Sequence, residues 1–382
     1  VKNEGKQPVT FTFEVDESGN NRWKTLKSVT VSPGKAASVP FGAMEKGEWI
    51  RVKADKNTMA TATFSYTSSD NRAMSPAPIY NGLTSVDKDK TTGGLLYGLG
   101  DDRRVLGLLA NTTVDGKVSE TGYYEMGDKL ELIRKDDAKT ADFIRSKFAI
   151  PQQVLSIEEG SVLVVDDLGR RWRLPLGNEQ YKNLTEQGVL RICREVATER
   201  DLFSCMGTFY ELPAENADGY AKIRPVSSHN FRINDYASYR GMLLLTGVTP
   251  EEGKDNPHIV ISDDGKAAVW VGVIDDLWSL GKPVGQGGPW KDTNVQAGVA
   301  SDPYLIAFYD KKELSLSHQS DKNVVITVEV DPTGNGDWMD YASYTVKPGE
   351  KFVQQLPESF QARWVRFVSD TDTKATAWLE YK

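Results

Sequence analysis

The two ends of the chain carry the same sequence unit. Residues 9–66 align with residues 324–381 at a constant offset of 315 without a gap, and 21 of the 58 aligned pairs are identical. The identical pairs include Trp23 with Trp338, Trp49 with Trp364, and Pro33-Gly34 with Pro348-Gly349. Identities at turns and strand-like segments predict that both ends fold into the same structural unit, and duplication of this kind is typical of repetitive architectures.

Alternation of apolar and polar residues predicts strands in both copies. Residues 9–15 alternate as a half-buried strand does, and residues 324–330 are more continuously apolar. Each copy continues through a Gly-Asn turn, a second strand and a Pro-Gly turn, so that it contains about four strands. Strand-like residues 304–308 and 314–317 lead into the second copy alone. Either strands elsewhere complete the first copy, or the chain is the C-terminal portion of a longer protein.

The middle of the chain repeats this alternation of strands and tight turns. Hairpins are predicted where residues 162–165 and 171–174 flank an Asp-Asp-Leu-Gly turn, and where residues 259–261 and 268–271 flank Asp263-Asp264-Gly265. Helical patterning is confined to residues 137–147 and 178–186. The chain is therefore predicted to be all-β.

Many short strands at regular spacing favour a β-propeller of about seven four-stranded blades. In this prediction residues 1–382 form a single domain, with related terminal units at 6–67 and 321–382 and the candidate site region at 190–295. The terminal units would help to close the ring. The alternative is a central β domain with a β-sandwich module at each end.

Composition excludes several classes of function. The net charge is −8 and the basic residues form no long run, which disfavours nucleic-acid binding. No stretch approaches 18 consecutive apolar residues, so no membrane span is expected. The chain opens with polar residues rather than a signal peptide, and we expect a secreted or periplasmic protein whose signal has been removed.

Neither a cofactor nor a metal centre is expected. The two cysteines, Cys193 and Cys205, are predicted to be free thiols rather than a disulfide, and with three widely spaced histidines they make no metal cluster. Residues 16–21 and 331–337 carry oxygen groups that could hold a structural calcium ion. They lack the length and the glutamate of a calcium loop, and Asn-Gly turn chemistry accounts for them better.

The densest cluster of polar and aromatic residues runs from Ser227 to Gly241. In this cluster His229 is a candidate general base, Tyr236 or Tyr239 a candidate acid, and Arg232 or Arg240 a candidate ligand for a substrate carboxylate. The alternative is that His229 caps a turn and that the tyrosines pack between blades.

A second cluster spans residues 270–292. Trp278 or Trp290 could stack on a sugar ring, and Lys282 or Lys291 could bind an acidic group. The alternative is a long crossover that its tryptophans anchor. A third stretch, from Arg191 to Asp201, alternates in charge, which favours a solvated salt-bridge lattice over a pair of glycosidase carboxylates.

Several of these segments resemble segments of carbohydrate-active β-propeller proteins from polysaccharide-degrading bacteria. They are Ser228-His229-Asn230 through Tyr239-Arg240-Gly241, Asp264-Gly265-Lys266, Asp275-Asp276-Leu277-Trp278 with Leu280-Gly281-Lys282-Pro283, and Gly288-Pro289-Trp290-Lys291-Asp292. In related propeller polysaccharide lyases and rhamnose–glucuronate-cleaving enzymes, a histidine acts with a tyrosine and an arginine. The resemblance therefore implies catalytic roles for His229, Tyr239 and Arg240.

These observations predict an enzyme that cleaves a glycosidic bond next to a uronic acid, in an acidic polysaccharide or oligosaccharide, by β-elimination or hydrolysis. Elimination requires that the carboxylate be neutralised, because neutralisation lowers the pKa of the adjacent C–H bond. The rival predictions are a non-catalytic propeller that binds glycan or protein through aromatic platforms, and the C-terminal portion of a larger glycan-degrading protein.

Overall fold

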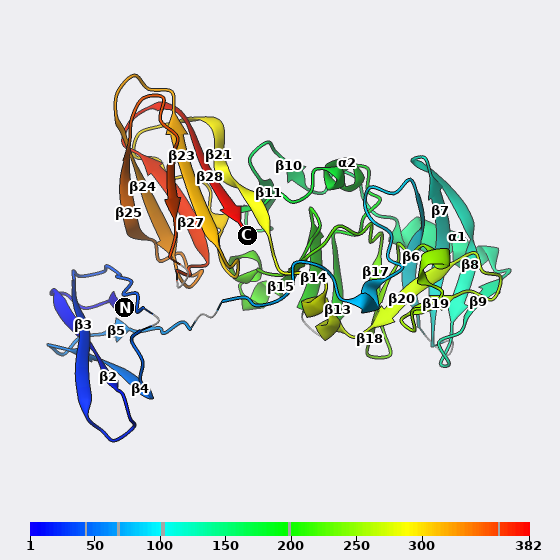
Figure 1. The fold of residues 1–382 in the computed structure, drawn as a ribbon, viewed down its shortest axis with the longest axis horizontal. Helices are drawn as coiled ribbons and strands as arrows, with labels where there is room; N and C mark the ends of the chain where they lie inside the picture. Colours follow the sequence, from blue (N-terminus) through cyan, green and yellow to red (C-terminus); the bar gives the residue numbers. More distant parts are fainter. Residues whose placement is uncertain (43, 67–68, 101–103, 198–199, 358–359) are drawn as a thin grey trace. The chain divides into compact units, whose positions relative to one another are not determined.

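The computed structural model covers residues 1–382 and describes all of them except 43, 67–68, 101–103, 198–199 and 358–359. The chain divides into two compact units (Figure 1). The terminal unit contains residues 1–70 and 287–380, and the central unit contains residues 71–286 with 381–382. Among the described residues, no helix is both long and apolar enough to cross a membrane.

The central unit is built from antiparallel sheets, as the all-β prediction requires. The first is β6 (Lys90–Leu99), β7 (Val105–Val114), β8 (Lys117–Met126) and β9 (Leu132–Lys135), paired in chain order. It is followed by β10 (Ser156–Ile157), β11 (Val162–Val165) and β12 (Arg171–Leu174), and then by β13 (Cys193–Ala197), β14 (Arg200–Cys205), β15 (Thr208–Pro213) and β16 (Arg224–Ser228). The last sheet has the order β17 (Tyr236–Tyr239), β18 (Met242–Leu245), β20 (Ala268–Gly272) and β19 (Ile259–Ile261).

Helices are few in the central unit. They are α1 (Ala138–Phe148), α2 (Gln180–Glu186), α3 (Pro250–Gly253) and the 3-10 turns η1 (Pro78–Tyr80), η2 (Glu215–Ala217), η3 (Gly219–Lys222) and η4 (Ile274–Ser279). Helices α1 and α2 confirm the two helices predicted from sequence. The hairpins β11–β12 and β19–β20 confirm the two predicted hairpins.

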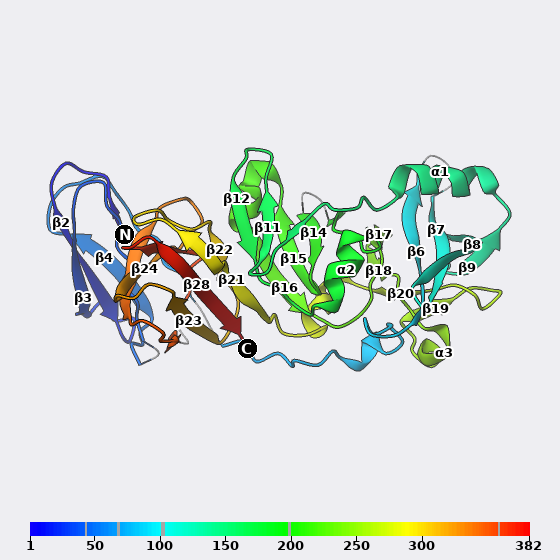
Figure 2. The same cartoon turned by 90° about the horizontal axis from the view of Figure 1, so that it is seen from above.

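The β17–β20 sheet is covered on both faces. On one face Ala237, Leu244 and Val269 share a buried cluster with residues of β6, β7 and β8. On the other face Leu243, Leu245 and Trp270 share a cluster with residues of β14, β15 and β16. Figure 2 shows the three sheets side by side along the unit. Face-to-face burial of apolar residues stabilises this stack by about 25 cal/mol per Å² of buried surface.

Stacked four-stranded sheets are the building blocks of a propeller. The closure of a ring, the number of seven blades and the assignment of residues 1–382 to a single propeller stay predictions. The alternative, a central β domain with a β-sandwich module at each end, stays a prediction as well.

In the terminal unit, each of the two sequence copies forms its own sheet, and the strands pair in the same way in both. The first copy pairs β2 (Val9–Asp16) with β3 (Trp23–Val31) and β4 (Trp49–Ala54), and the second pairs β24 (Val324–Asp331) with β25 (Met339–Val346) and β27 (Trp364–Ser369). Every register differs by the offset of 315, and the bulge at Phe13/Glu14 recurs at Val328/Glu329. The duplication predicted from sequence is thus a duplication of structure.

A carboxylate organises the same turn in both copies. Asp16 accepts the backbone N–H groups of Ser18, Asn20 and Asn21. In the second copy Asp331 accepts the equivalent groups of Thr333, Asn335 and Gly336, and that of Gly334 as well. Such turns satisfy backbone donors with an Asp side chain. The carboxylate oxygens are therefore occupied by their own turns, and structural calcium at these turns stays an untested prediction.

A second shared feature joins neighbouring strands. Arg51 donates to Glu14 at 2.6 Å, and its guanidinium lies 3.9 Å from the ring centroid of Trp23. In the second copy Arg366 donates to Glu329 and lies 4.3 Å from Trp338. A carboxylate, a guanidinium and an indole on three adjacent strands link the sheet through charge and cation–π contact.

The two copies differ in what covers their sheets. The second copy has a second sheet, ordered β21 (Gly285–Val295), β28 (Thr373–Tyr381), β23 (Lys312–His318) and β26 (Phe352–Gln355), and its first sheet also includes β22 (Tyr304–Leu305). Among the described residues of the first copy, β1 (Lys2–Asn3) and β5 (Ala60–Thr61) pair as a two-stranded sheet, at positions equivalent to parts of β23 and β28. Trp364 is 0% exposed, whereas its counterpart Trp49 is 66% exposed.

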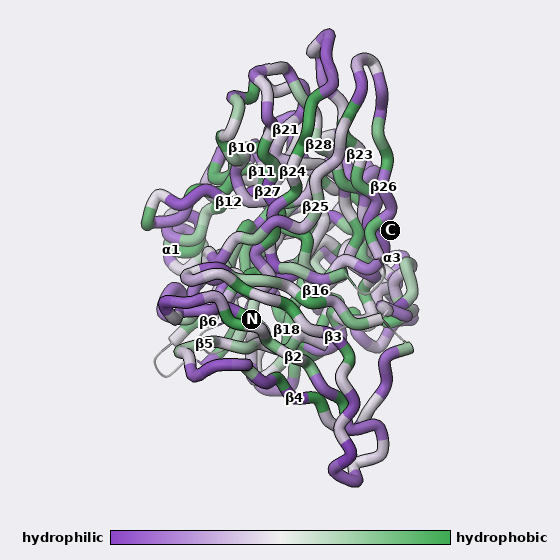
Figure 3. Tube along the Cα trace, turned by 90° about the vertical axis from the view of Figure 1, so that its left-hand side faces the viewer, coloured by the Kyte–Doolittle hydropathy of each residue, from purple (hydrophilic) through white to green (hydrophobic). Residues whose placement is uncertain are grey.

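Hydropathy follows these layers. Along the chain trace in Figure 3, hydrophobic stretches lie within strands and the tips of long hairpins are hydrophilic. In β28 the buried residues alternate with partly exposed ones, as in a strand with one face toward a core.

Separate replacement of Trp49 and Trp364 tests whether these two identical residues contribute equally to stability. Trp364→Ala opens a cavity in a covered sheet, so we expect it to lower the free energy of unfolding by about 3–5 kcal/mol. Trp49→Ala should change it by less than about 1 kcal/mol. Urea unfolding of both variants measures the difference. Equal losses would show that the sheet of the first copy is covered in solution as well.

Candidate functional site

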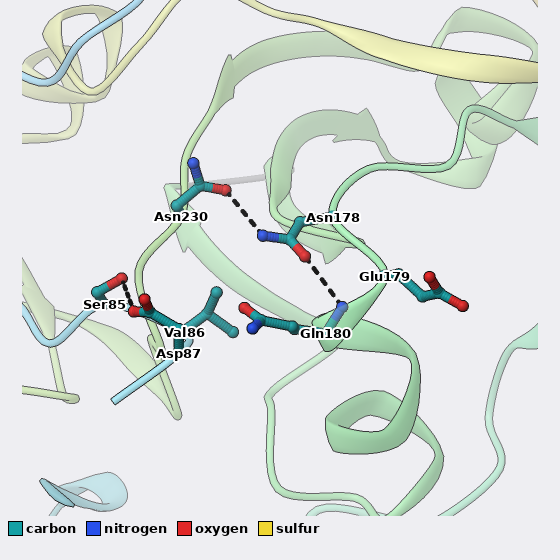
Figure 4. A pocket seen from close by; sticks show the side chains of 7 residues that line it. All are labelled: Ser85, Val86, Asp87, Asn178, Glu179, Gln180 and Asn230. Carbon is teal, nitrogen blue, oxygen red and sulfur yellow. Dashed lines mark hydrogen bonds between the residues drawn. The ribbon is translucent and has the colours of Figure 1, made fainter. Parts of the chain in front are cut away.

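A polar pocket of about 440 Å³ opens on the central unit. It is lined by Ser85, Val86, Asp87, Asn178, Glu179, Gln180 and Asn230 (Figure 4). The first three residues precede β6, the next three lie at the start of α2, and Asn230 lies between β16 and β17. The volume falls within the range of about 300–1,000 Å³ that small-molecule sites occupy.

Backbone pairing brings these three segments together. The N–H of Val86 donates to the carbonyl of Asn230 at 2.7 Å, and Ser85 pairs with Phe231 in an isolated β-bridge. The side chain of Asn178 accepts the N–H of Gln180 at 3.0 Å and donates to Asn230 Oδ1 at 3.4 Å. These two hydrogen bonds of Asn178 connect the start of α2 with Asn230 along one wall of the pocket.

The remaining polar groups of the lining are available to a ligand. Among the described residues, no hydrogen bond engages the side-chain amide of Gln180, the Nδ2 of Asn230 or the carboxylate of Glu179. Figure 4 shows Gln180 extending toward Val86 and Asp87, whereas Glu179 points the other way. Amide donors and carboxylate acceptors suit a ligand rich in hydroxyl groups, because each hydroxyl both donates and accepts.

Asp87 is the ionised group of this lining. The hydroxyl of Ser85 donates to it, and this hydrogen bond, together with the backbone and Lys88, lowers the pKa of its carboxyl against a smaller effect of burial. At neutral pH the carboxylate is charged and acts only as an acceptor. It can therefore bind hydroxyls or take up a proton, and it holds no proton to donate.

His229 lies next to the pocket residue Asn230, but its ring points into the interior. Its Nδ1 accepts the N–H of Phe231 at 3.1 Å and lies 3.3 Å from the hydroxyl of Tyr181. Its Nε2 is buried and has no hydrogen-bond partner among the described residues. Burial lowers the pKa of the imidazole to about 3, so that His229 is neutral at physiological pH. Its catalytic role stays a prediction.

The two candidate tyrosines bind backbone carbonyl groups. Tyr236 is fully buried, and its hydroxyl donates to Leu202 O at 2.7 Å. Tyr239 donates to Arg104 O at 2.9 Å and accepts from Arg240 Nε at 3.0 Å. Arg240 has φ 51° and Gly241 φ 78°, because the two residues form the tight turn of the β17–β18 hairpin. These contacts account for the three residues structurally, and their catalytic roles stay predictions.

The arginines before β14 surround a buried acid. Asp235 is 0% exposed and accepts from Arg191 at 3.0 and 3.1 Å, while Arg194 lies 3.2 Å away. It also accepts the backbone N–H groups of Leu96 and Tyr236. The prediction of a solvated lattice is therefore wrong for Arg191 and Arg194, because their charges are paired with an acid in the interior. The sequence hides this contact, since Asp235 lies some forty residues away.

Arg232 has a different environment from these arginines. It is 7% exposed, and its Nε has no hydrogen-bond partner among the residues that the structure describes. Burial lowers the pKa of its guanidinium. Its predicted role, recognition of a substrate carboxylate, stays a prediction.

The second predicted cluster is split between the two units. Trp278 lies in the central unit, 40% exposed, with the guanidinium groups of Arg72 and Arg224 at 4.6 and 5.1 Å from its ring. The N–H of Lys282, in the same unit, donates to Ala73 O. Trp290 and Lys291 belong to the terminal unit, where Trp290 is buried near Phe367 and Lys291 lies 5.3 Å from the ring of Trp378. Their substrate-binding roles stay predictions.

Sequence reasoning missed most of the pocket. Asp87, Asn178 and Gln180 occur in short polar loop segments that resemble many others, and only Asn230 lies within a predicted cluster. Their proximity depends on pairing between residues 84–86 and 230–232, which no local pattern reveals. The cysteines were predicted correctly, since Cys193 and Cys205 are free thiols and burial raises the pKa of each to about 12.

Comparison with known proteins gives distant likenesses. No protein-family profile and no curated protein matches the chain. Among solved structures, a glycoside hydrolase is 12% identical over 75% of this chain and 83% of its own, with a TM-score of 0.16. The GH32 β-fructofuranosidase BmSUC1 of Bombyx mori is 10% identical over 75% and 78%, also with a TM-score of 0.16. Scores of this size do not establish a shared fold, so function must be inferred from the residues of the chain itself.

His229 should make the stability of the protein depend on pH. In the unfolded chain histidine takes up a proton near pH 6.5, whereas the folded imidazole stays neutral down to about pH 3. The unfolded state therefore binds more protons as the pH falls, and stability declines from pH 6.5 toward pH 3. At pH 5 we expect a loss of about 2 kcal/mol from this residue.

The variant His229→Asn tests this expectation, because Asn Oδ1 can still accept the N–H of Phe231. Urea unfolding at pH 7 and pH 5 should show a smaller decline for His229→Asn than for the unchanged protein. His258→Asn, at the other histidine of the central unit, serves as the control and should retain the full decline. Equal pH dependence in all three proteins would mean that His229 is protonated in the folded state.

Proposed function

We propose that this protein is carbohydrate-active and binds sugar units of a polysaccharide or oligosaccharide in the pocket between residues 85–87, 178–180 and 230. The lining of this pocket supports the proposal. Amide groups from Asn178, Gln180 and Asn230 face a charged carboxylate, and no apolar residue other than Val86 lines the space. A hydroxyl-rich ligand satisfies such a set, whereas an apolar ligand would leave the amides unpaired.

In its finer form, the proposal is that the glycan contains uronic acid units and that the protein acts outside the cytoplasm, in the secreted or periplasmic space. Among the described residues no cation lines the pocket, so an acidic group would have to be recognised by a neighbouring residue. Lys88 directly follows Asp87, and Arg232 follows Asn230 by two positions, so both are candidates.

Bond cleavage is a second proposal, and one observation favours it. Two carboxylates, those of Asp87 and Glu179, line the same pocket. Hydrolysis of a glycosidic bond uses a pair of carboxyl groups, and β-elimination uses a base with a neutralised uronate. With Asp87 ionised, its carboxylate would serve as the base or the nucleophile of such a reaction. In this proposal the chain is an enzyme, and the alternative is a binding module or a portion of a larger enzyme.

Binding can be tested without knowledge of the sugar. A glycan array identifies the ligand, and calorimetry then measures its affinity for Asn230→Ala and Gln180→Ala. Each variant removes a side-chain NH₂ group that no described residue engages in a hydrogen bond. We expect each to weaken binding by about 5- to 10-fold, the effect of one lost hydrogen bond.

The control variant is Asn183→Ala, which changes an exposed residue on the same helix outside the lining. It should bind as the unchanged protein does. Absence of any glycan ligand, or equal loss in all three variants, would contradict the proposed pocket.

Cleavage requires a separate measurement of products. Incubation of the identified glycan with the protein should release shorter saccharides, with an unsaturated uronate if the reaction is elimination. Asp87→Asn should lower kcat by at least about 100-fold, since general acid–base groups contribute that much. Binding without turnover would leave the protein as a glycan-binding module.

A further inference from the structure

The first sequence copy has an open strand edge at a position that the second copy covers. In the second copy, β28 lies between β21 and β23, so both of its edges are paired. In the first copy, the equivalent segment begins as β5 and pairs with β1 alone among the described residues. Strand β5 ends at Thr61, whereas β28 continues past the equivalent position to Tyr381.

A recurring hydrogen bond shows which edge of the segment is occupied. The N–H of Glu4, just after β1, donates to Met59 O at 2.9 Å. At the offset of 315, the N–H of Gln319, just after β23, donates to Lys374 O at 2.9 Å. Strand β1 therefore takes the place of β23, and the edge that β21 covers in the second copy is open in the first.

The open segment keeps the apolar residues of the covered strand. Three buried residues of β28 have apolar counterparts in the first copy: Ala375 with Ala60, Ala377 with Ala62, and Leu379 with Phe64. Leu379 is 1% exposed, but Phe64 is 37% exposed and Tyr66 beyond it is 86% exposed. Exposed apolar residues along an unpaired strand edge are typical of a segment that pairs with another chain.

Strand β21 shows what kind of strand the edge accepts. A Cβ atom at Gly288 would lie 1.7 Å from the carbonyl oxygen of Ala377, so glycine allows the two backbones to meet. Two residues further on, Trp290 is buried with its ring centroid 6.0 Å from that of Phe367. A strand in this place thus presents a glycine to the backbone and an aromatic ring to the core.

A threonine hydroxyl provides a polar contact at the same edge. The N–H of Asp292 in β21 donates to Thr376 Oγ1 at 3.0 Å. The counterpart of Thr376 is Thr61, which is exposed and whose hydroxyl makes no hydrogen bond among the described residues. This hydroxyl is therefore available to a backbone N–H of an added strand.

We infer that residues 60–66 accept an extended strand of another protein, which pairs with them as β21 pairs with β28. Every strand of the described part of the chain already belongs to a sheet, so none of them is left to fill this place. Strand addition satisfies the backbone groups of an open edge and covers its apolar side chains. The partner strand carries a glycine opposite Ala62 and an aromatic residue two positions later.

The probe for this edge is a synthetic peptide with the sequence of residues 285–295 of the chain. Fluorescence anisotropy of the labelled peptide measures its affinity for the full chain. Peptides with Gly288→Val or Trp290→Ala are the matched controls, because the first cannot approach the carbonyl oxygen and the second lacks the buried ring. We expect each to bind at least about 10-fold more weakly than the unchanged peptide.

Two variants of the protein test the position of the edge. Phe64→Ser removes an apolar contact, and Ala62→Pro removes a backbone N–H from an exposed residue. The second variant tests the same edge even if the first fails to fold. Val118→Ser, at an exposed residue of β8, is the control. The peptide should lose at least about 10-fold in affinity for the first two variants and none for the control.

Hydrogen exchange reports where the peptide binds. The amides of residues 60–66 should exchange more slowly with the peptide than without it, because pairing in a sheet protects N–H groups from solvent. The amides of β8 should exchange at the same rate in both conditions.

Three results would overturn the inference. They are a failure of the unchanged peptide to bind, binding that Phe64→Ser and Ala62→Pro leave unaffected, and self-association of the chain that these variants abolish. The last result, measured by ultracentrifugation, would assign the edge to a second copy of the chain. None of the three affects the proposed function, since residues 60–66 belong to the terminal unit and the pocket to the central unit.

Discussion

The carboxylate of Asp235 joins three sheets of the central unit at one point. It accepts the N–H of Leu96 in β6, the N–H of Tyr236 in β17, and the guanidinium of Arg191 just before β13. A fully buried acid is tolerated only when such partners replace its water. Removal of any of them would leave charge in the interior, so the sheets are constrained to the spacing that satisfies the acid. Apolar clusters stabilise the stack, and Asp235 determines how its sheets align.

This arrangement also leaves an excess of positive charge in the interior. Arg191 and Arg194 share the single carboxylate of Asp235. Arg232 lies a few residues before Asp235 on the same segment. Backbone bonds hold Arg232 in place between Thr84 and Gly247, since its N–H donates to Thr84 O and a Cβ at Gly247 would collide with its carbonyl. The guanidinium is therefore positioned by the main chain, with its charge free for another role.

The repetitive part of the fold could be predicted from the sequence because its determinants are local. The turn aspartates Asp16 and Asp331, and the Trp23 and Trp338 pair, recur at a fixed offset and make the same contacts in both copies. Burial could not be predicted in this way. Trp49 and Trp364 are identical residues at equivalent positions, yet Trp364 is fully buried and Trp49 is mostly exposed. The pocket and the Asp235 contacts were missed for a related reason, since they join segments up to about 140 residues apart.

The duplication also indicates where function resides. In both terminal copies the recurring polar side chains are engaged by the copy itself: the turn carboxylates by backbone N–H groups, and the paired glutamates by arginines. Groups that satisfy one another have little left for a ligand. The central unit differs, because its pocket amides and Arg232 are held by backbone contacts while their side-chain groups remain unsatisfied. Preorganised but unpaired polar groups are what a binding site requires, and in the described part of the chain they gather around residues 230–234.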